Sequence, residues 1–350
     1  MKRIIKIFNK TIGDSYPVFI VAELSANHLQ NFDLALKTIE AMKGAGADAV
    51  KLQTYTPDTI TIDSKKDYFR IKQGTLWDEK YFYELYKEAY TPWDWHPKLF
   101  EFAKELGLIC FSSPFDKTAV DFLEELKTPA YKVASFEITD IPLIEYIASK
   151  GKPIIISTGI ATLSDIEEAI NACKKMGNDQ IILLKCVSLY PTPFEDANLR
   201  TIPNMKEVFN VPVGLSDHTL GISVPIAAVA LGAVMIEKHF ILDRKLGGPD
   251  SAFSLEPEEF KAMVKAVREV EKALGEIKYE LNESQLKSRE FSRSLFAVKD
   301  IKAGETFTEE NIKSIRPGYG LHPKYLKEII GKRARRDIER GTPLSWDMIE

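Results

Sequence analysis

Two histidines stand at the ends of two consecutive apolar segments that have the composition of β-strands. Val-Gly-Leu-Ser-Asp-His ends at His218, and Val-Met-Ile-Glu-Lys-His ends at His239. The interval between the segments has room for one helix and its turns, so the strands can be parallel neighbours. The carboxyl ends of parallel barrel strands meet at one rim, where the two imidazoles would lie side by side. This spacing predicts a metal shared by His218 and His239.

The groups around the two histidines indicate which metal they would bind. Asp217, Glu237 and Asp250 lie near them in sequence, without a neighbouring cysteine. Two imidazoles leave several coordination positions for oxygen ligands. This favours Mn²⁺ or Mg²⁺ with bound substrate and water over a closed structural zinc site. The alternative is that each histidine is a hydrogen-bonded core residue.

Two lysines are unusual because they interrupt apolar segments. Lys51 and Lys132 each lie within a buried-strand pattern, where an unpaired ammonium group is costly. Hydroxyls stand at the ends of neighbouring strand segments: Ser113, Ser135 and Ser157. The lysines and hydroxyls together predict a phosphate or carboxylate ligand. The alternative is a buried ion pair with Glu23 or Glu237.

Three further side chains are candidates for the same rim. Glu23 lies at the end of the first strand segment and is a candidate general acid or base, although an ion pair with a lysine would also explain it. Tyr190, in Tyr-Pro-Thr-Pro, is a candidate contact for a sugar or a base, or it shapes the loop. His28 follows the first strand closely enough to face the site, whereas His96 and His322 are expected to be structural.

Eight segments predict strands, and each is nearly continuous in apolar residues, as in parallel strands buried on both faces. They are residues 18–24, 49–54, 108–113, 130–135, 153–158, 181–188, 211–217 and 235–240. Amphipathic patterns between and after them predict helices, including 33–45, 95–106, 118–126, 143–149, 165–175, 223–231 and 257–274. Eight such units in about 275 residues predict a (β/α)8 TIM barrel, with chemistry at the carboxyl ends of the strands. A doubly wound sheet is the alternative.

The last part of the chain differs in character from the barrel segment. Residues 278–293 are polar and charged, and they predict a linker after a barrel domain of residues 1–277. Residues 294–350 combine short β-type segments with glycine-centred turns, which predicts a small β-rich domain. The fold class is therefore α/β, a TIM barrel followed by a small C-terminal domain.

Composition sets limits on partners and location. The formal net charge of −4 gives no global attraction for nucleic acid or a membrane surface. The three cysteines have no metal-binding spacing, which favours buried thiols in a reducing compartment. The N-terminus lacks the features of a signal peptide, and no apolar segment is long enough to span a membrane. We therefore expect a cytoplasmic protein.

Several of these segments resemble one known family. The segments are Ala-Glu-Leu-Ser-Ala-Asn-His, Val-Lys-Leu-Gln, Ser-Ser-Pro-Phe-Asp, Tyr-Lys-Val-Ala-Ser, Tyr-Pro-Thr-Pro, Gly-Leu-Ser-Asp-His-Thr, Glu-Lys-His-Phe and Gly-Pro-Asp. In this order they resemble the sialic acid synthases, which condense phosphoenolpyruvate with an N-acylated hexose. The tail is similar to the antifreeze-like (SAF) domain of that family. The first motif carries Leu-Ser-Ala where the neuraminate and legionaminate enzymes have a glycine, and is similar to the pseudaminic branch.

The resemblance implies a C–C bond-forming transferase and a role for each candidate residue. Phosphoenolpyruvate would be held by Lys51, Lys132, Ser113, Ser135 and Ser157, with Gln53, Ser188 and Glu237 close by. His218 and His239 would bind the divalent metal, and Glu23 would assist the attacking water. Asp250 and Tyr190 would contact the sugar. Ser188 departs from the neuraminate enzymes, which generally have asparagine there.

The resemblance also implies an assembly and leaves two other functions open. Family members form domain-swapped homodimers, so Phe291 and Arg316 would reach the partner's sugar pocket. One alternative is a neuraminate or legionaminate synthase that uses another N-acylated hexose. The other alternative is a non-catalytic sugar-binding protein.

Overall fold

The computed structural model describes residues 4–72 and 74–350. The chain divides into two compact units, Met1–Gly275 and Glu276–Glu350. The division falls just before residue 277, where the sequence predicts the end of the barrel domain. The segment predicted as a linker contains a short helix, α11 (Glu283–Ser288).

The first unit is a closed barrel of eight parallel strands, which confirms the predicted TIM barrel and excludes the doubly wound sheet. The strands are β3 (Phe19–Glu23), β4 (Ala49–Thr54), β5 (Ile109–Pro114), β6 (Tyr131–Val133), β7 (Ile154–Ser157), β8 (Ile181–Lys185), β9 (Val213–Asp217) and β10 (Met235–His239). Strand β10 closes the barrel on β3, with His239 opposite Glu23. Glu23 in turn lies opposite Lys51 of β4.

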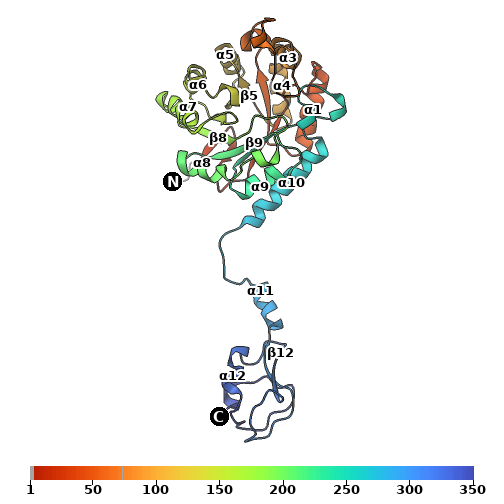
Figure 1. Ribbon diagram of the computed structural model, residues 1–350, viewed down its shortest axis with the longest axis vertical. Coiled ribbons are helices and arrows are strands. Elements are labelled where there is room, and N and C mark those ends of the chain that lie inside the picture. The colour runs from red at the N-terminus through yellow and green to blue at the C-terminus, as the bar shows by residue number, and fades with distance from the viewer. Residues whose placement is uncertain (1–3, 73) are drawn as a thin grey trace. The chain divides into compact units, whose positions relative to one another are not determined.

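Helices surround the barrel, as Figure 1 shows. They are α1 (Phe32–Gly44), α4 (His96–Glu105), α5 (Lys117–Glu125), α6 (Ile141–Ala148), α7 (Leu163–Lys175), α8 (Thr201–Phe209), α9 (Ser223–Ala230) and α10 (Pro257–Leu274). Helix α8 is not among the helices named from the sequence. Pro203 interrupts its pattern, but in the first helical turn a proline removes no intrahelical hydrogen bond.

Each strand turns alternate residues into the barrel and towards the helices. Phe19, Phe111, Ile155 and Ile182 belong to an interior apolar cluster, whereas Ile20 and its equivalents pack against the helices. The polar residues Glu23, Lys51 and Glu237 also point into the barrel, because they lie an even number of residues after inward-facing apolar residues of the same strands. They stand nearer the carboxyl ends of those strands. The barrel interior therefore changes from apolar side chains to charged ones along its axis.

Two additions to the barrel were not predicted. A hairpin of β1 (Ile5–Ile7) and β2 (Lys10–Ile12) contributes Ile5, Ile7 and Ile12 to the interior apolar cluster. Between β4 and α4, an insertion forms α2 (Pro57–Ile60), η1 (Asp67–Phe69), α3 (Phe82–Ala89) and η2 (Trp93–Trp95). The insertion follows the carboxyl end of β4, so it lies at the rim that carries the candidate site.

The second unit has a hydrophobic core of its own. Its elements after α11 are η7 (Arg289–Phe291), β11 (Ser294–Ala297), β12 (Ile312–Ile315), η8 (Pro323–Tyr325), α12 (Leu326–Ile329) and η9 (Trp346–Met348). Strands β11 and β12 form a two-stranded antiparallel sheet. Across the described residues of both units, the structure contains no helix long and apolar enough to cross a membrane.

Candidate active site

Four charged side chains meet inside the barrel at the carboxyl ends of β3, β4, β6 and β10. Lys51 Nζ lies 2.8 Å from Glu237 Oε1 and 3.1 Å from Glu23 Oε2. Lys132 Nζ lies 3.8 Å from the same Glu237 oxygen. All four are buried. We call Glu23, Lys51, Lys132 and Glu237 the charge cluster. Its ion pairs are the buried lysine–glutamate pairs that the sequence offered as an alternative to a bound anion.

The two carboxylates of the charge cluster differ in their electrostatic surroundings. Burial raises the pKa of Glu23 above its usual value, although Lys51 acts against this. Burial would also raise the pKa of Glu237, but Lys132 and Lys51 together hold it below its usual value. Burial lowers the pKa of Lys132 to about 8. When Glu23 is protonated, two ammonium groups face one carboxylate, and the cluster attracts an anion.

Hydroxyls border the charge cluster, and several have no internal partner. Within residues 4–72 and 74–350, the buried Oγ atoms of Ser113, Ser157 and Ser188 make no hydrogen bond. Ser135 Oγ accepts one from the Gly159 N–H, at 3.1 Å. A buried hydroxyl without a partner costs roughly 1–3 kcal/mol, a cost that a bound oxyanion would remove.

The two histidines lie side by side, with ring centroids 5.4 Å apart. The His218 Nδ1–H donates to the Val187 carbonyl at 3.0 Å. Burial would lower the pKa of His218, but the neighbouring Cys186 holds it above its usual value. His239 Nδ1 is buried without a hydrogen bond, 3.8 Å from Asp250 Oδ2. Burial and the neighbouring His218 lower the pKa of His239 well below its usual value, so this imidazole is neutral.

This arrangement fits a divalent metal that keeps most of its positions open. Imidazole binds a metal in its neutral form, so a metal at His218 would displace any proton on its Nε2, and the orphaned His239 nitrogen gains a partner when a metal binds. No group of three or more His, Cys, Asp or Glu side chains suited to a metal occurs among the described residues. A metal held by His218 and His239 would therefore rely on substrate and water oxygens, as predicted for Mn²⁺ or Mg²⁺.

Two of the carboxylates predicted near the histidines face elsewhere. Asp217 forms a buried ion pair with Lys238 and accepts a hydrogen bond from the Thr219 hydroxyl. Asp217 and Lys238 each lie two residues after a strand residue that packs against the helices, so both point out of the barrel. Glu237 points inward, but towards the lysines of the charge cluster. Asp250 alone lies beside a histidine.

A short loop after β3 links the charge cluster to Asp250. Gln53 Nε2 donates to Glu23 Oε1 at 3.1 Å and to Ser25 Oγ at 2.9 Å. The Ala26 N–H faces Asp250 Oδ2 at 3.4 Å. Burial raises the pKa of Asp250, and hydrogen bonds from Ser25 and Ala26 act in the opposite direction.

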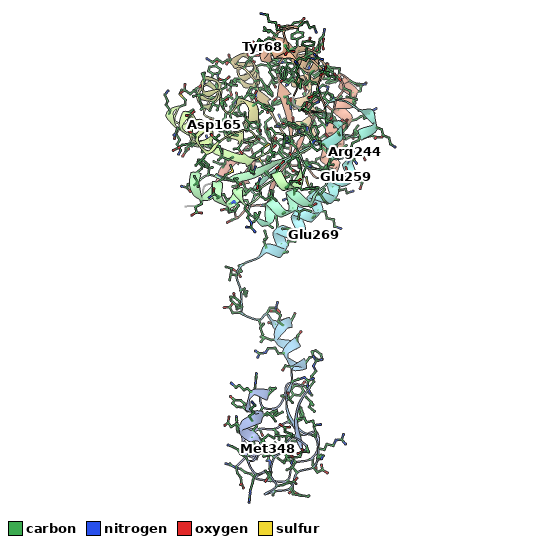
Figure 2. All side chains as sticks on the ribbon, viewed as in Figure 1. Tyr68, Asp165, Arg244, Glu259, Glu269 and Met348 are labelled. Atoms are coloured by element: carbon green, nitrogen blue, oxygen red, sulfur yellow. The ribbon has the colours of Figure 1, made fainter. Side chains whose placement is uncertain are left out.

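Asp250 itself comes from the loop after β10, which α10 anchors. Arg244 forms two hydrogen bonds with the Glu259 carboxylate, one of them 2.8 Å long. Figure 2 labels both residues, which lie close together at the side of the barrel. This bidentate pair ties the start of the loop to the first turn of α10 and so limits its movement.

A cavity of about 360 Å³ covers the rim. Its polar side includes Gln53, Ser135, Ser188, His239 and Asp250, and its apolar side includes Tyr55, Ile71, Trp77, Phe82, Tyr86 and Phe115. Tyr190 lies between the two sides, with its ring centroid 4.4 Å from that of His218 and 5.4 Å from that of Trp77. The Trp77 indole N–H donates to the Pro249 carbonyl at 3.0 Å. We call this apolar side of the cavity the apolar wall. Most of its residues belong to the insertion between β4 and α4.

Several residues in or beside this cavity were not predicted from the sequence. Glu137 follows β6 and lines the cavity, and burial raises its pKa to about 7. Gly159 faces the serines so closely that an added Cβ would lie 2.1 Å from Ser188 Oγ. Cys186 Sγ lies 3.8 Å from His218 Nδ1. The inward alternation of Ile182 and Leu184 continues to Cys186, one residue past β8, and was a usable signal for it. Nothing in the sequence pointed to Trp77.

Other predicted residues lie away from this rim. His28 is buried, with Nε2 3.1 Å from Thr91 Oγ1 and its ring against Trp95, so the prediction that it faces the site was wrong. His96 is buried beside Thr54, at 2.9 Å. Phe291 and Arg316 belong to the second unit and are exposed there. Their reach into a partner's sugar pocket stays a prediction.

The fold and the site place the protein among the TIM-barrel enzymes, with polar and charged groups gathered at the carboxyl ends of the strands. The chain belongs to the NeuB family, whose pattern matches residues 38–279, and a SAF domain matches residues 292–350.

Two relatives and one solved structure show how close the similarity is. The pseudaminic acid synthase of Campylobacter jejuni (strain 81-176) is 54% identical over 327 residues, which is 93% of this chain and 95% of that protein. The pseudaminic acid synthase of Helicobacter pylori is 53% identical over 335 residues, 95% of this chain and 98% of that protein. The N-acetylneuraminic acid synthetase of Leptospira borgpetersenii, solved with citrate, is 35% identical with a TM-score of 0.74, covering 82% and 95% of the two chains.

Proposed function

We propose that this chain is a pseudaminic acid synthase. It condenses phosphoenolpyruvate with 2,4-diacetamido-2,4,6-trideoxy-L-altrose and water, and releases pseudaminic acid and phosphate. The observation that carries the proposal is the convergence of two buried lysines and three unpartnered hydroxyls beside His218 and His239.

Phosphoenolpyruvate occupies the anion half of the site. Its phosphate and carboxylate neutralise Lys51 and Lys132 and take up the hydroxyls of Ser113, Ser157 and Ser188, while Ser135 stands close by. The buried position strengthens each of these interactions, because few water molecules compete for the same groups. Lys132 contributes most to the change on binding, since its ammonium group lies beyond hydrogen-bonding distance of Glu237 in the free protein.

A divalent metal bound to His218 and His239 would act as a Lewis acid that polarises the aldehyde of the open-chain sugar. Our preference for Mn²⁺ or Mg²⁺ rests on the two-imidazole donor set. C3 of phosphoenolpyruvate forms a bond to C1 of the sugar, and the electron pair comes from the enol double bond. Water then adds to C2, and the C2–O bond to phosphate breaks, so that phosphate leaves with the bridging oxygen.

In this proposal, Glu23 accepts a proton from that water. Its carboxylate is held by Lys51 and Gln53, both of which border the anion half. Because burial raises its pKa, the carboxyl group can take a proton near neutral pH and return it. Glu237 stays ionised between the two lysines and keeps them oriented.

The sugar fits the cavity by its mixed chemistry. Two acetamido methyl groups and the 6-methyl group face the apolar wall, while Asp250, Gln53 and Tyr190 meet the polar groups. A hexose that carries more hydroxyls would leave those hydroxyls against Trp77, Phe82 and Tyr86 without partners. The apolar wall is therefore the feature that favours the trideoxy sugar over N-acetylmannosamine.

The proposal includes an assembly and a location. The SAF domain of one subunit caps the cavity of the other in a homodimer, with Arg316 and Phe291 at the sugar. The three free, buried cysteines are consistent with the reducing cytoplasm.

Phosphate release tests the proposal. Purified protein with Mn²⁺ and phosphoenolpyruvate is assayed with the diacetamido trideoxy altrose and, separately, with N-acetylmannosamine. We expect phosphate release that depends on the altrose and is at least tenfold slower with the mannosamine. A tenfold difference is within the range that an apolar pocket supplies when it discriminates between substrates. Release with the mannosamine alone would make the chain a neuraminate-type enzyme. Tight sugar binding without release would make it a sugar-binding protein.

A further inference from the structure

Ser25 has a backbone conformation that its side chain disfavours. Its φ is +43°, in the left-handed region that glycine occupies freely and that other residues rarely adopt. The loop around it leaves no choice. The Leu24 N–H donates to the Lys51 carbonyl at 3.1 Å, and Asn27 Nδ2 donates to the Phe240 carbonyl and to Ser254 Oγ, each at 2.9 Å. Glycine would satisfy this loop without strain, so the backbone does not explain the serine.

The Ser25 hydroxyl explains it. Ser25 is buried, and Oγ accepts a hydrogen bond from Gln53 Nε2 at 2.9 Å. The Ser25 hydroxyl also acts on the Asp250 carboxylate, whose pKa it lowers against the effect of burial. Asp250 receives the neighbouring Ala26 N–H as well, at 3.4 Å. Both polar neighbours of the hydroxyl line the cavity, and so does Ser25 itself.

These contacts form a continuous path across the site. Lys51 pairs with Glu23, Glu23 accepts from Gln53, and Gln53 donates to Ser25. The N–H of Ala26, the next residue, then faces the Asp250 carboxylate, whose pKa the Ser25 hydroxyl lowers. The path begins in the charge cluster and ends 3.8 Å from His239. Ser25 stands between Gln53 of β4 and Asp250 of the loop after β10.

We propose that Ser25 is a positioning residue, whose hydroxyl holds the Asp250 carboxylate and the Gln53 amide in the orientation that binds the sugar. The strained backbone is the cost of placing a hydroxyl at this point, and strain retained at a ligand site is expected where surrounding contacts fix it. This inference rests on the proposed function, because it assigns Asp250 and Gln53 to the sugar.

Two substitutions separate the hydroxyl from the backbone. Ser25→Ala removes the hydroxyl and keeps the strain, whereas Ser25→Gly removes both. We expect each variant to raise KM for the hexose about tenfold, as for a lost hydrogen-bonded group, and to leave KM for phosphoenolpyruvate within about twofold. Ser25→Gly should also raise Tm by about 2 °C, because glycine tolerates the conformation.

Lys127→Gly is the matched control. Lys127 is exposed, has φ of +56° and lies after α5, at the opposite end of the barrel strands. This variant should raise Tm in the same way and leave both KM values unchanged. If Ser25→Gly keeps the parent's KM for the hexose, or if KM rises equally for both substrates, the hydroxyl has no positioning role and the proposal is overturned.

A crystal structure of Ser25→Gly tests the same point without any substrate. The Asp250 carboxylate should turn away from the Ala26 N–H, and the Gln53 amide should rotate about its side chain. Unmoved side chains would overturn the proposal even if the parent acts on a different hexose. Failure of the parent to release phosphate, by contrast, would count against the proposed function alone.

Discussion

Lys132 and Glu237 lie 3.8 Å apart inside the barrel, whereas Lys51 approaches the same carboxylate oxygen to 2.8 Å. The difference of one ångström separates an ion pair from a hydrogen bond. Lys51 therefore remains charged over the whole working pH range, because Glu23 and Glu237 raise its pKa despite its burial. Lys132 is held more weakly, and burial lowers its pKa to about 8.

This asymmetry predicts the alkaline limit of the reaction. Below pH 8 Lys132 carries its proton and attracts phosphoenolpyruvate; above pH 8 the free enzyme loses that charge. We expect kcat/KM for phosphoenolpyruvate to fall about tenfold per pH unit above pH 8. Lys132→Arg should move this limb to higher pH, because guanidinium stays charged. A pH profile that is identical for parent and Lys132→Arg would contradict the assignment.

Gly159 predicts a second, more local effect. A Cβ at this position would meet Ser188 Oγ at 2.1 Å and Ser135 Oγ at 2.6 Å. Gly159→Ala should therefore displace two hydroxyls of the anion half and raise KM for phosphoenolpyruvate at least tenfold, with little change in KM for the hexose. Gly44→Ala is the control, because an added Cβ there meets nothing within 4 Å. Equal effects on both substrates would show that the serines do not serve the anion alone.

Trp77 predicts how the apolar wall acts. Its ring packs against Tyr190, and its N–H bonds the Pro249 carbonyl next to Asp250. Trp77→Ala should raise KM for the trideoxy hexose about tenfold, since it removes a large apolar contact. Trp77→Phe keeps an aromatic ring but loses the hydrogen bond and part of the apolar surface, so its effect should be smaller, about threefold. Steady-state kinetics with both variants checks this, and an unchanged KM in Trp77→Ala would remove the wall from sugar recognition.

Metal analysis distinguishes Asp217, the last residue of β9, from His239, the last residue of β10. His239→Ala should lose bound Mn²⁺ and phosphate release together, because one of two protein ligands is gone. Asp217→Asn should keep the metal, yet lose about 3 kcal/mol of unfolding free energy, since Lys238 is left buried without its partner. Elemental analysis and urea denaturation measure the two quantities. Metal retained by His239→Ala, or lost by Asp217→Asn, would reverse the assignment of the ligands.

Much of this architecture could be predicted from the sequence because the strands are buried on both faces. All eight strand segments stand out as apolar runs, and each ends close to a polar residue of the rim. The same uniformity hides which side of the strand faces inward. Asp217 and Glu237 therefore look equivalent in sequence, although one points to the helices and the other to the lysines. His28 was misplaced because the loop after Glu23 turns it towards Thr91.

The apolar wall escaped prediction for a different reason. Its residues belong mostly to an insertion of short helices, which are too short to show a clear hydrophobic periodicity in the sequence. They form one surface only after the insertion folds back on the rim. Trp77 and Asp250 are far apart in the chain, and nothing local to either residue indicates their proximity. The charge cluster was within reach of sequence analysis, because a lysine inside an apolar strand needs a partner wherever the strand lies.

The central claim is that this rim joins phosphoenolpyruvate to an aldehyde and breaks the C2–O bond. Phosphoenolpyruvate labelled with ¹⁸O at the bridging oxygen tests it most directly. During turnover with the trideoxy altrose, mass spectrometry should find the label in the released phosphate, because that oxygen leaves with phosphorus. Unlabelled phosphate, with the ¹⁸O left on carbon, would mean that the P–O bond breaks instead, and would contradict this account of the site.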